Sequence, residues 1–160
     1  MNAAGANPTR LTSAPGDDFA PAWSPDGQQI AFASDRDQAA GVYSIYIMNA
    51  DGSSVKRLTN DQGIDYSPAW SPDGKQIAFR SHHGGPADIY VINVDGSNLH
   101  ALTNNQGGNW SPSWSPDGTS ILFQTNRDGN WEIYLMNADG NSPRNLTNHP
   151  ADDQYPNMKP

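Results

Sequence analysis

The chain repeats one pattern of apolar and polar positions three times. Its clearest copy is SPAWSPDGKQIAF at positions 67–79, and the tryptophans of the three copies are Trp23, Trp70 and Trp114. An Ile-Tyr pair follows each copy, and the tyrosines of these pairs lie 44 residues apart. A Leu-Thr pair then ends each unit. A fixed period of this length predicts a repeat architecture with one supersecondary unit per repeat.

Within each repeat the pattern predicts four short strands. The first, for example 66–71, ends in Ser-Pro-Asp-Gly, a tight turn in which proline presets its φ angle. The second alternates apolar and polar positions and is predicted at 28–33, 75–80 and 119–124. The third is apolar at both alternate positions, so both of its faces must be covered, and it is predicted at 44–49, 88–93 and 132–137. The fourth is more polar, which is typical of an edge strand facing water.

Apolar middle strands predict sheets that stack face to face. The sequence has no amphipathic helical segment, which excludes helical solenoids, and its period is too long for a parallel β-helix. The predicted fold class is therefore all-β, a β-propeller of four-stranded antiparallel blades with three blades per chain. We expect a flexible tail at 1–7, a three-bladed unit at 8–150 with repeats at about 14–60, 61–104 and 105–148, and the truncated start of a fourth repeat at 151–160.

Composition limits the classes of partner. Seventeen acidic and nine basic residues give a net charge of −8, which disfavours nucleic acid and anionic membrane surfaces. The absence of cysteine excludes disulfides and thiolate metal sites. The sequence starts without the apolar segment of a signal peptide, and its composition does not identify a compartment.

The order of the motifs resembles the repeat of TolB-type β-propellers. The shared pattern is Leu-Thr, then Asp-x-x-Pro-x-Trp-Ser-Pro-Asp-Gly, Ile-x-Phe and Ile-Tyr-x-Met-Asn-x-Asp-Gly, and it covers residues 8–147. The resemblance implies a WD-like propeller that binds protein partners in the periplasm or outside the cell, with the cytoplasm left open. Related repeats also form propeller domains of serine peptidases and polysaccharide lyases. The chain departs from the family in having three complete repeats, a half-propeller, with Met158 at the fourth tryptophan position.

An acidic or amide residue and an aromatic residue recur where the first strand of each repeat begins. These candidate binding residues are Asp18, Phe19, Asp65, Tyr66, Asn109 and Trp110. Repetition around a propeller would place them in a ring at the mouth of the central channel. Two interpretations stay open, because aspartates also cap local turns and accept hydrogen bonds from nearby backbone amides.

If the ring binds a ligand, its negative charge favours a cation. A Lys/Arg-rich peptide is preferred, since its cations could also lie over the aromatic faces. Ca²⁺ is the alternative, but it needs several oxygens within about 2.6 Å, closer than single acids spread around a wide ring would stand. No cofactor is therefore expected.

The sequence contains no nucleophile elbow, zinc-protease motif or P-loop, so it assigns no catalytic residues. A non-enzymatic binding and scaffold module is favoured, and an enzyme or enzyme-accessory propeller that uses channel Asp and His residues is the alternative. Adjacent His82 and His83 favour a solvated loop over a metal site, because neighbouring side chains on an extended chain point apart.

Three blades make half of a ring, because propellers close with about four to eight blades. Apolar faces on the first and last blades would invite association, and a twofold axis would close two chains into a six-bladed homodimer. In that ring residues 8–12 would compete with the partner's residues 142–147 for one outer edge, and the short local hairpin is favoured. Trp23, Trp70 and Trp114 are expected to be buried between blades.

Overall fold

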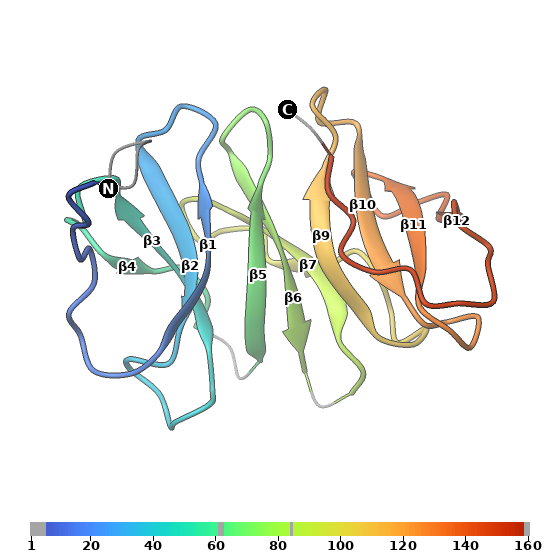
Figure 1. Ribbon diagram of the computed structural model, residues 1–160, viewed down its shortest axis with the longest axis horizontal. Coiled ribbons are helices and arrows are strands. Elements are labelled where there is room, and N and C mark those ends of the chain that lie inside the picture. The colour runs from blue at the N-terminus through green and yellow to red at the C-terminus, as the bar shows by residue number, and fades with distance from the viewer. Residues whose placement is uncertain (1–5, 61–62, 84, 159–160) are drawn as a thin grey trace.

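The computed structural model describes residues 6–60, 63–83 and 85–158, which form three four-stranded antiparallel sheets (Figure 1). Each sheet consists of four consecutive strands, and the three sheets lie side by side in chain order. The predicted all-β architecture of three four-stranded blades is confirmed. Residues 1–5 of the predicted tail and 159–160 of the predicted fourth repeat lie outside the described residues.

The strands lie within the repeats that the sequence predicts. The first blade comprises β1 (Asp18–Trp23), β2 (Gln29–Ser34), β3 (Ser44–Asn49) and β4 (Lys56–Arg57). The second comprises β5 (Ile64–Trp70), β6 (Gln76–His82), β7 (Asp88–Asn93) and β8 (His100–Ala101). The third comprises β9 (Asn109–Trp114), β10 (Ser120–Thr125), β11 (Glu132–Asn137) and β12 (Arg144–Asn145). The fourth strands are only two residues long, and β12 pairs locally with β11, while residues 8–12 form no strand.

The core lies between neighbouring blades. One apolar cluster joins Ala31, Ile45 and Ile47 of the first blade to Trp70 and Phe79 of the second. A second cluster joins the second blade to the third in the same way. This face-to-face packing explains why the middle strands are apolar at both alternate positions, as β3 shows with five buried residues out of six.

The exposure of each tryptophan depends on whether another blade precedes its own. Trp70 and Trp114 are each 9% exposed, as expected, and the indole of Trp70 donates a hydrogen bond to the Ala22 carbonyl of the first blade at 3.1 Å. The prediction is wrong for Trp23, which is 59% exposed. Trp23 lies on the first blade, and no described blade precedes it to cover the indole.

The first strand of each blade contains a β-bulge. Its register with the second strand shifts after Phe19, Tyr66 and Trp110. The next residue has a left-handed backbone each time, with φ of 48° at Ala20, 52° at Ser67 and 53° at Ser111. A bulge of this kind bends the strand and leaves one residue unpaired.

The Ser-Pro-Asp-Gly segments form the predicted turns. In the third blade the Ser115 hydroxyl donates to Asp117 at 2.6 Å, and the Thr119 N–H and hydroxyl donate to the same oxygen at 3.0 and 2.9 Å. These hydrogen bonds lower the pKa of Asp117 to about 2. The aspartates of the three turns therefore have a structural role.

Replacing Trp70 with alanine should lower the free energy of unfolding by about 3–5 kcal/mol, because a buried indole leaves a cavity. Leu99→Ala is the control, and we expect it to change stability by less than about 1 kcal/mol because the Leu99 side chain is exposed. Urea denaturation of both variants measures the difference. Equal losses would contradict the proposed burial.

Acidification should destabilise the protein in part through Asp117. The folded pKa of this carboxyl lies below its unfolded value of about 3.9, so its stabilising effect is present above about pH 4 and is lost as the pH falls toward 2. We expect Asp117→Asn to show a shallower loss of unfolding free energy between pH 4 and 2. Parallel profiles of variant and wild type would refute this role.

Candidate functional site

A continuous line of contacting aromatic and arginine side chains crosses all three blades near the starts of their first strands. We call it the aromatic row, and it consists of Phe19, Tyr43, Tyr66, Arg80, Trp110 and Trp131. Ring centroids are 5.3 Å apart for Phe19 and Tyr43, 5.0 Å for Tyr43 and Tyr66, and 4.6 Å for Trp110 and Trp131. The Arg80 guanidinium carbon lies 4.4 Å from the Tyr66 centroid and 4.7 Å from that of Trp110, and it joins the two halves.

Arg80 lies on β6, opposite Tyr66 in the register, and reaches across to Trp110 in the next blade. Ala33 and Gln124 occupy the corresponding positions of the other blades, so this cation occurs once in the row. Burial lowers the pKa of Arg80, but guanidinium keeps its charge in proteins. Its Nε is buried and has no hydrogen-bond partner among the described residues.

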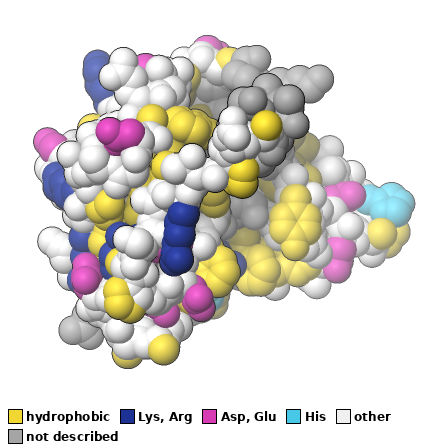
Figure 2. Space-filling model, turned by 60° about the vertical axis from the view of Figure 1, so that its left-hand side comes forward, with side chains coloured by type: hydrophobic (Ala, Val, Ile, Leu, Met, Phe, Trp, Pro, Cys, Tyr) yellow, Lys and Arg dark blue, Asp and Glu magenta, His cyan; other side chains and the backbone are white. Residues whose placement is uncertain are grey.

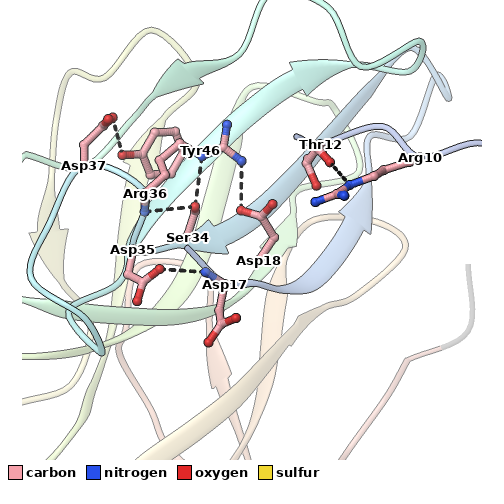
Figure 3. Close-up of polar contacts among 9 residues, drawn as sticks. All are labelled: Arg10, Thr12, Asp17, Asp18, Ser34, Asp35, Arg36, Asp37 and Tyr46. Atoms are coloured by element: carbon pink, nitrogen blue, oxygen red, sulfur yellow. Dashed lines mark hydrogen bonds and ion pairs between the residues drawn. The ribbon is translucent and has the colours of Figure 1, made fainter. Parts of the chain in front are cut away.

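Asp18 is engaged within its own blade (Figure 3). Arg36 donates to its carboxylate at 2.8 Å, as Figure 3 shows. The same guanidinium lies over the rings of Phe32 and Tyr46, at 5.0 and 5.1 Å from their centroids. Partial burial raises the pKa of Asp18, but hydrogen bonds from Ser34, Arg36 and Thr12 outweigh it, so the net shift is downward. The charge of Asp18 is thus balanced internally.

Asp65 and Asn109 are fully buried. The Ser81 hydroxyl donates to Asp65, and Arg127 donates to the Asn109 side-chain oxygen at 3.0 Å. Their backbone N–H groups donate to carbonyls of the preceding blade, at 2.9 Å for Asp65 and 2.7 Å for Asn109. The interpretation as local structural residues therefore accounts for both.

The six predicted site residues thus separate into two groups. Phe19 is 47% exposed, Tyr66 and Trp110 are half-buried, and these three side chains belong to the aromatic row. The acidic and amide residues face inward instead of forming an accessible negative ring. The repeat pattern identifies the recurring aromatic residues, but it does not show that Asp18 and Asp65 accept hydrogen bonds from Arg36 and Ser81.

Sequence reasoning missed Tyr43, Arg80 and Trp131. Tyr43 and Trp131 hold one position of the repeat, but alanine takes that position in the second blade, and Arg80 has no counterpart of its type. A search for recurring residue types cannot find such positions. His83 holds the same position of the repeat as Arg36 and Arg127, because each follows its tryptophan at the same distance along the chain. The structure agrees: the His83 ring contacts Tyr90 with centroids 4.9 Å apart, and the two arginines lie over the corresponding tyrosines.

A pocket lies where the first strands end. We call it the Trp-Ser-Pro pocket; it has a volume of about 360 Å³ and is lined mainly by Trp23, Pro25, Trp70, Pro72, Trp114 and Met158. The Trp-Ser-Pro motif of each of the three blades lines it, together with Met158, which stands at the tryptophan position of the fourth repeat. Within the described residues no group of three or more His, Cys, Asp or Glu could hold a metal ion.

The family model of the TolB beta propeller domain matches residues 4–107. The chain belongs to this family. Its three four-stranded sheets match part of the fold of solved TolB structures. No curated protein matches the chain.

The TolB-type fold recurs in solved structures. TolB from Acinetobacter baumannii is 27% identical with a TM-score of 0.78, and the match covers 89% of this chain and 35% of that one. A putative TolB from Agrobacterium tumefaciens is 24% identical with a TM-score of 0.72, covering 92% of this chain and 68% of that one. A puromycin-hydrolyzing peptidase from Mycobacterium tuberculosis is 21% identical with a TM-score of 0.67, covering 85% of this chain and 24% of that one, and shares the fold alone.

This TolB-type chain therefore spans about a third of the Acinetobacter protein. The described part of the chain contains no helix long and apolar enough to cross a membrane.

Proposed function

We propose that this TolB-type chain is a non-enzymatic binding module whose aromatic row holds an extended protein segment that carries a carboxylate. The observation that carries the proposal is the position of Arg80, stacked between Tyr66 and Trp110 at the centre of the row. Stacking covers the faces of a guanidinium and leaves its in-plane N–H groups as donors, a geometry that suits a carboxylate.

The aromatic rings supply the remaining affinity. Tyrosine, tryptophan and arginine side chains dominate the binding energy of protein interfaces, and aromatic rings bury large areas with few rotatable bonds. The row runs over three blades, so its length matches an extended segment better than a small molecule. Phe19, at 47% exposed, provides an accessible ring at one end.

The structure changes the chemistry expected of the partner. The sequence predicts a cationic peptide because Asp18 and Asp65 would face the channel. In the structure the Asp18 carboxylate forms an ion pair with Arg36, and Asp65 is fully buried, so neither is an exposed negative charge for a partner. Arg80 is the cation within the row itself. A basic partner remains a prediction, and the same experiment distinguishes it from an acidic one.

We also propose that two chains close a six-bladed ring. The strand β1 is exposed at four of its six residues, including Trp23. The corresponding strand of the next blade, β5, is largely covered by the first blade. Figure 2 brings the first-blade side forward and shows several groups of hydrophobic side chains at the surface, with charged side chains dispersed among them. A neighbouring blade would cover such a surface.

Calorimetric titration at low salt, with one aromatic peptide rich in Asp and Glu and one rich in Lys and Arg, tests the binding site. We expect the acidic peptide to bind, and Arg80→Gln to weaken it at least about tenfold, or about 1.4 kcal/mol. Glutamine suits this position because Gln124 occupies it in the third blade. Arg144→Gln, an exposed change of the same charge, is the control.

Similar losses in the two variants would show that net charge, not the stacked guanidinium, controls binding. Preference for the basic peptide, weakened by Asp18→Asn, would replace the proposal with the cationic partner. Absence of binding by either peptide would remove the site.

Light scattering tests the ring. We expect a particle of twice the chain mass of 17.3 kDa at micromolar concentration, because a second copy would cover the exposed β1. Trp23→Asp should shift the protein toward the monomer by placing a charge in the interface. A wild-type monomer at all concentrations up to about 100 μM would exclude closure with an affinity in the range of specific interfaces.

A further inference from the structure

Residues 153–158 follow the path of a first strand, although no strand in the described part of the chain pairs with them. Asp153 lies five residues before Met158, as Asp65 does before Trp70. Its N–H donates to the Trp131 carbonyl of the third blade at 2.7 Å. This repeats the bonds by which Asp65 and Asn109 join their blades to the preceding ones, at 2.9 and 2.7 Å.

The bulge of a first strand is also present. Tyr155 has φ of 59°, and it lies three residues before Met158, as Ala20 lies before Trp23 with φ of 48°. A positive φ is uncommon for a bulky residue, so its recurrence at this position marks the same backbone conformation. Proline follows it in both segments, as Pro156 and Pro21.

Side chains of the third blade hold this backbone in place. The Tyr155 N–H donates to the Gln124 side-chain oxygen at 2.7 Å, and the Met158 N–H donates to the Ser113 hydroxyl at 3.1 Å. Figure 1 shows the C-terminal segment in red, returning from β12 across the third blade to the side of β9. Met158 thereby reaches the Trp-Ser-Pro pocket, which Trp70 and Trp114 also line.

The opposite end of the chain shows the matching feature. Leu58 and Leu102 end their repeats and pack against the next blade, and Leu11 packs in the same way against the first blade. The Leu11 carbonyl approaches Gly52 as the Leu102 carbonyl approaches Gly140, at 2.7 Å from the position of an added Cβ in both cases. Leu146 has no such blade beside it and is 45% exposed. At each end of the three-blade unit a short segment thus takes part of the place that a neighbouring blade would fill, and β1 stays exposed.

We propose that the side of the third blade formed by Ser113, Gln124 and Trp131 is a docking surface for β1 of a second copy, and that residues 153–158 compete for it. The inference rests on the proposed ring closure. The sequence of β1 shares the aspartate and proline of the segment, and Ala20 already has the required backbone.

Two differences favour β1 over residues 153–158. Trp23 would replace Met158, and the corresponding Trp70 and Trp114 are 9% exposed where a blade precedes them. The strand β1 is also already paired with β2, whereas no strand among the described residues pairs with 153–158. Because residues 153–158 occupy the docking surface in some chains, the apparent affinity between copies is the intrinsic affinity multiplied by the fraction of chains in which the surface is vacant.

Two substitutions at Tyr155 test the competition without altering the third blade. The Tyr155 side chain is 78% exposed, so its loss removes little packing. Tyr155→Pro eliminates the N–H that donates to Gln124 and fixes φ near −65°, so it should release the segment. Tyr155→Gly keeps the N–H and tolerates the positive φ, so it should retain the segment.

The probe is a fluorescently labelled peptide with the sequence of residues 16–24. Its binding to the full chain is measured as an increase in its fluorescence anisotropy. We expect Tyr155→Pro to bind it at least about tenfold more tightly than Tyr155→Gly, with the wild type between them. A peptide with alanine in place of Trp23 should bind weakly to all three proteins. Equal affinities, or no binding to any protein, would overturn the docking surface.

The particle masses of the same variants, measured by light scattering, show whether a second copy of the chain occupies the docking surface. Tyr155→Pro should dimerise at lower concentration than Tyr155→Gly, because the surface is vacant more often. If both stay monomeric while the peptide shows the expected order, the second copy is overturned as occupant and ring closure fails with it. The Arg80→Gln titration is independent of both results, so failure of the aromatic row is recognised separately.

Discussion

Each blade depends on the apolar face of its neighbour. Strands such as β3 and β7 are apolar on both sides, and a four-stranded sheet of this kind has no water-facing surface that would make it stable alone. Phe79 and Ile77 are fully buried because the first blade covers them, whereas Trp23 is exposed at the position where that cover is missing. The architecture is therefore a stack in which each contact completes the blade on either side.

This requirement also explains how the polar groups are used. Where blades meet, backbone amides need partners, and the N–H groups of Asp65, Asn109 and Asp153 all donate to carbonyls across the contact. The side chains of Asp65 and Asn109 are then taken into the contact as well. Tyr66 and Trp110, which follow Asp65 and Asn109, project from the contact between blades. The aromatic rings and not the acids therefore form the accessible surface.

The sequence predicts the strands and turns well, because alternating positions and Ser-Pro-Asp-Gly are local signals. Strands 44–49, 88–93 and 132–137 agree with β3, β7 and β11 residue by residue. The candidate site was predicted only in part. Phe19, Tyr66 and Trp110 recur with the period, but Arg80 acquires its environment from Trp110 in another blade, a contact that no spacing within one repeat reveals. The repeat pattern likewise does not reveal the ion pair of Asp18 with Arg36, which lies 18 residues further along the chain.

The two-residue outer strands have a consequence for how this protein fails. A long unpaired edge is a template for adding strands from other chains, which leads to fibrils, but β4, β8 and β12 offer very few backbone groups for such growth. Chains that lose a blade contact therefore expose sheet faces more than sheet edges. Misassembly should accordingly give compact, limited aggregates with native-like strand content, and stress conditions that drive many β-proteins into amyloid should find little to extend here.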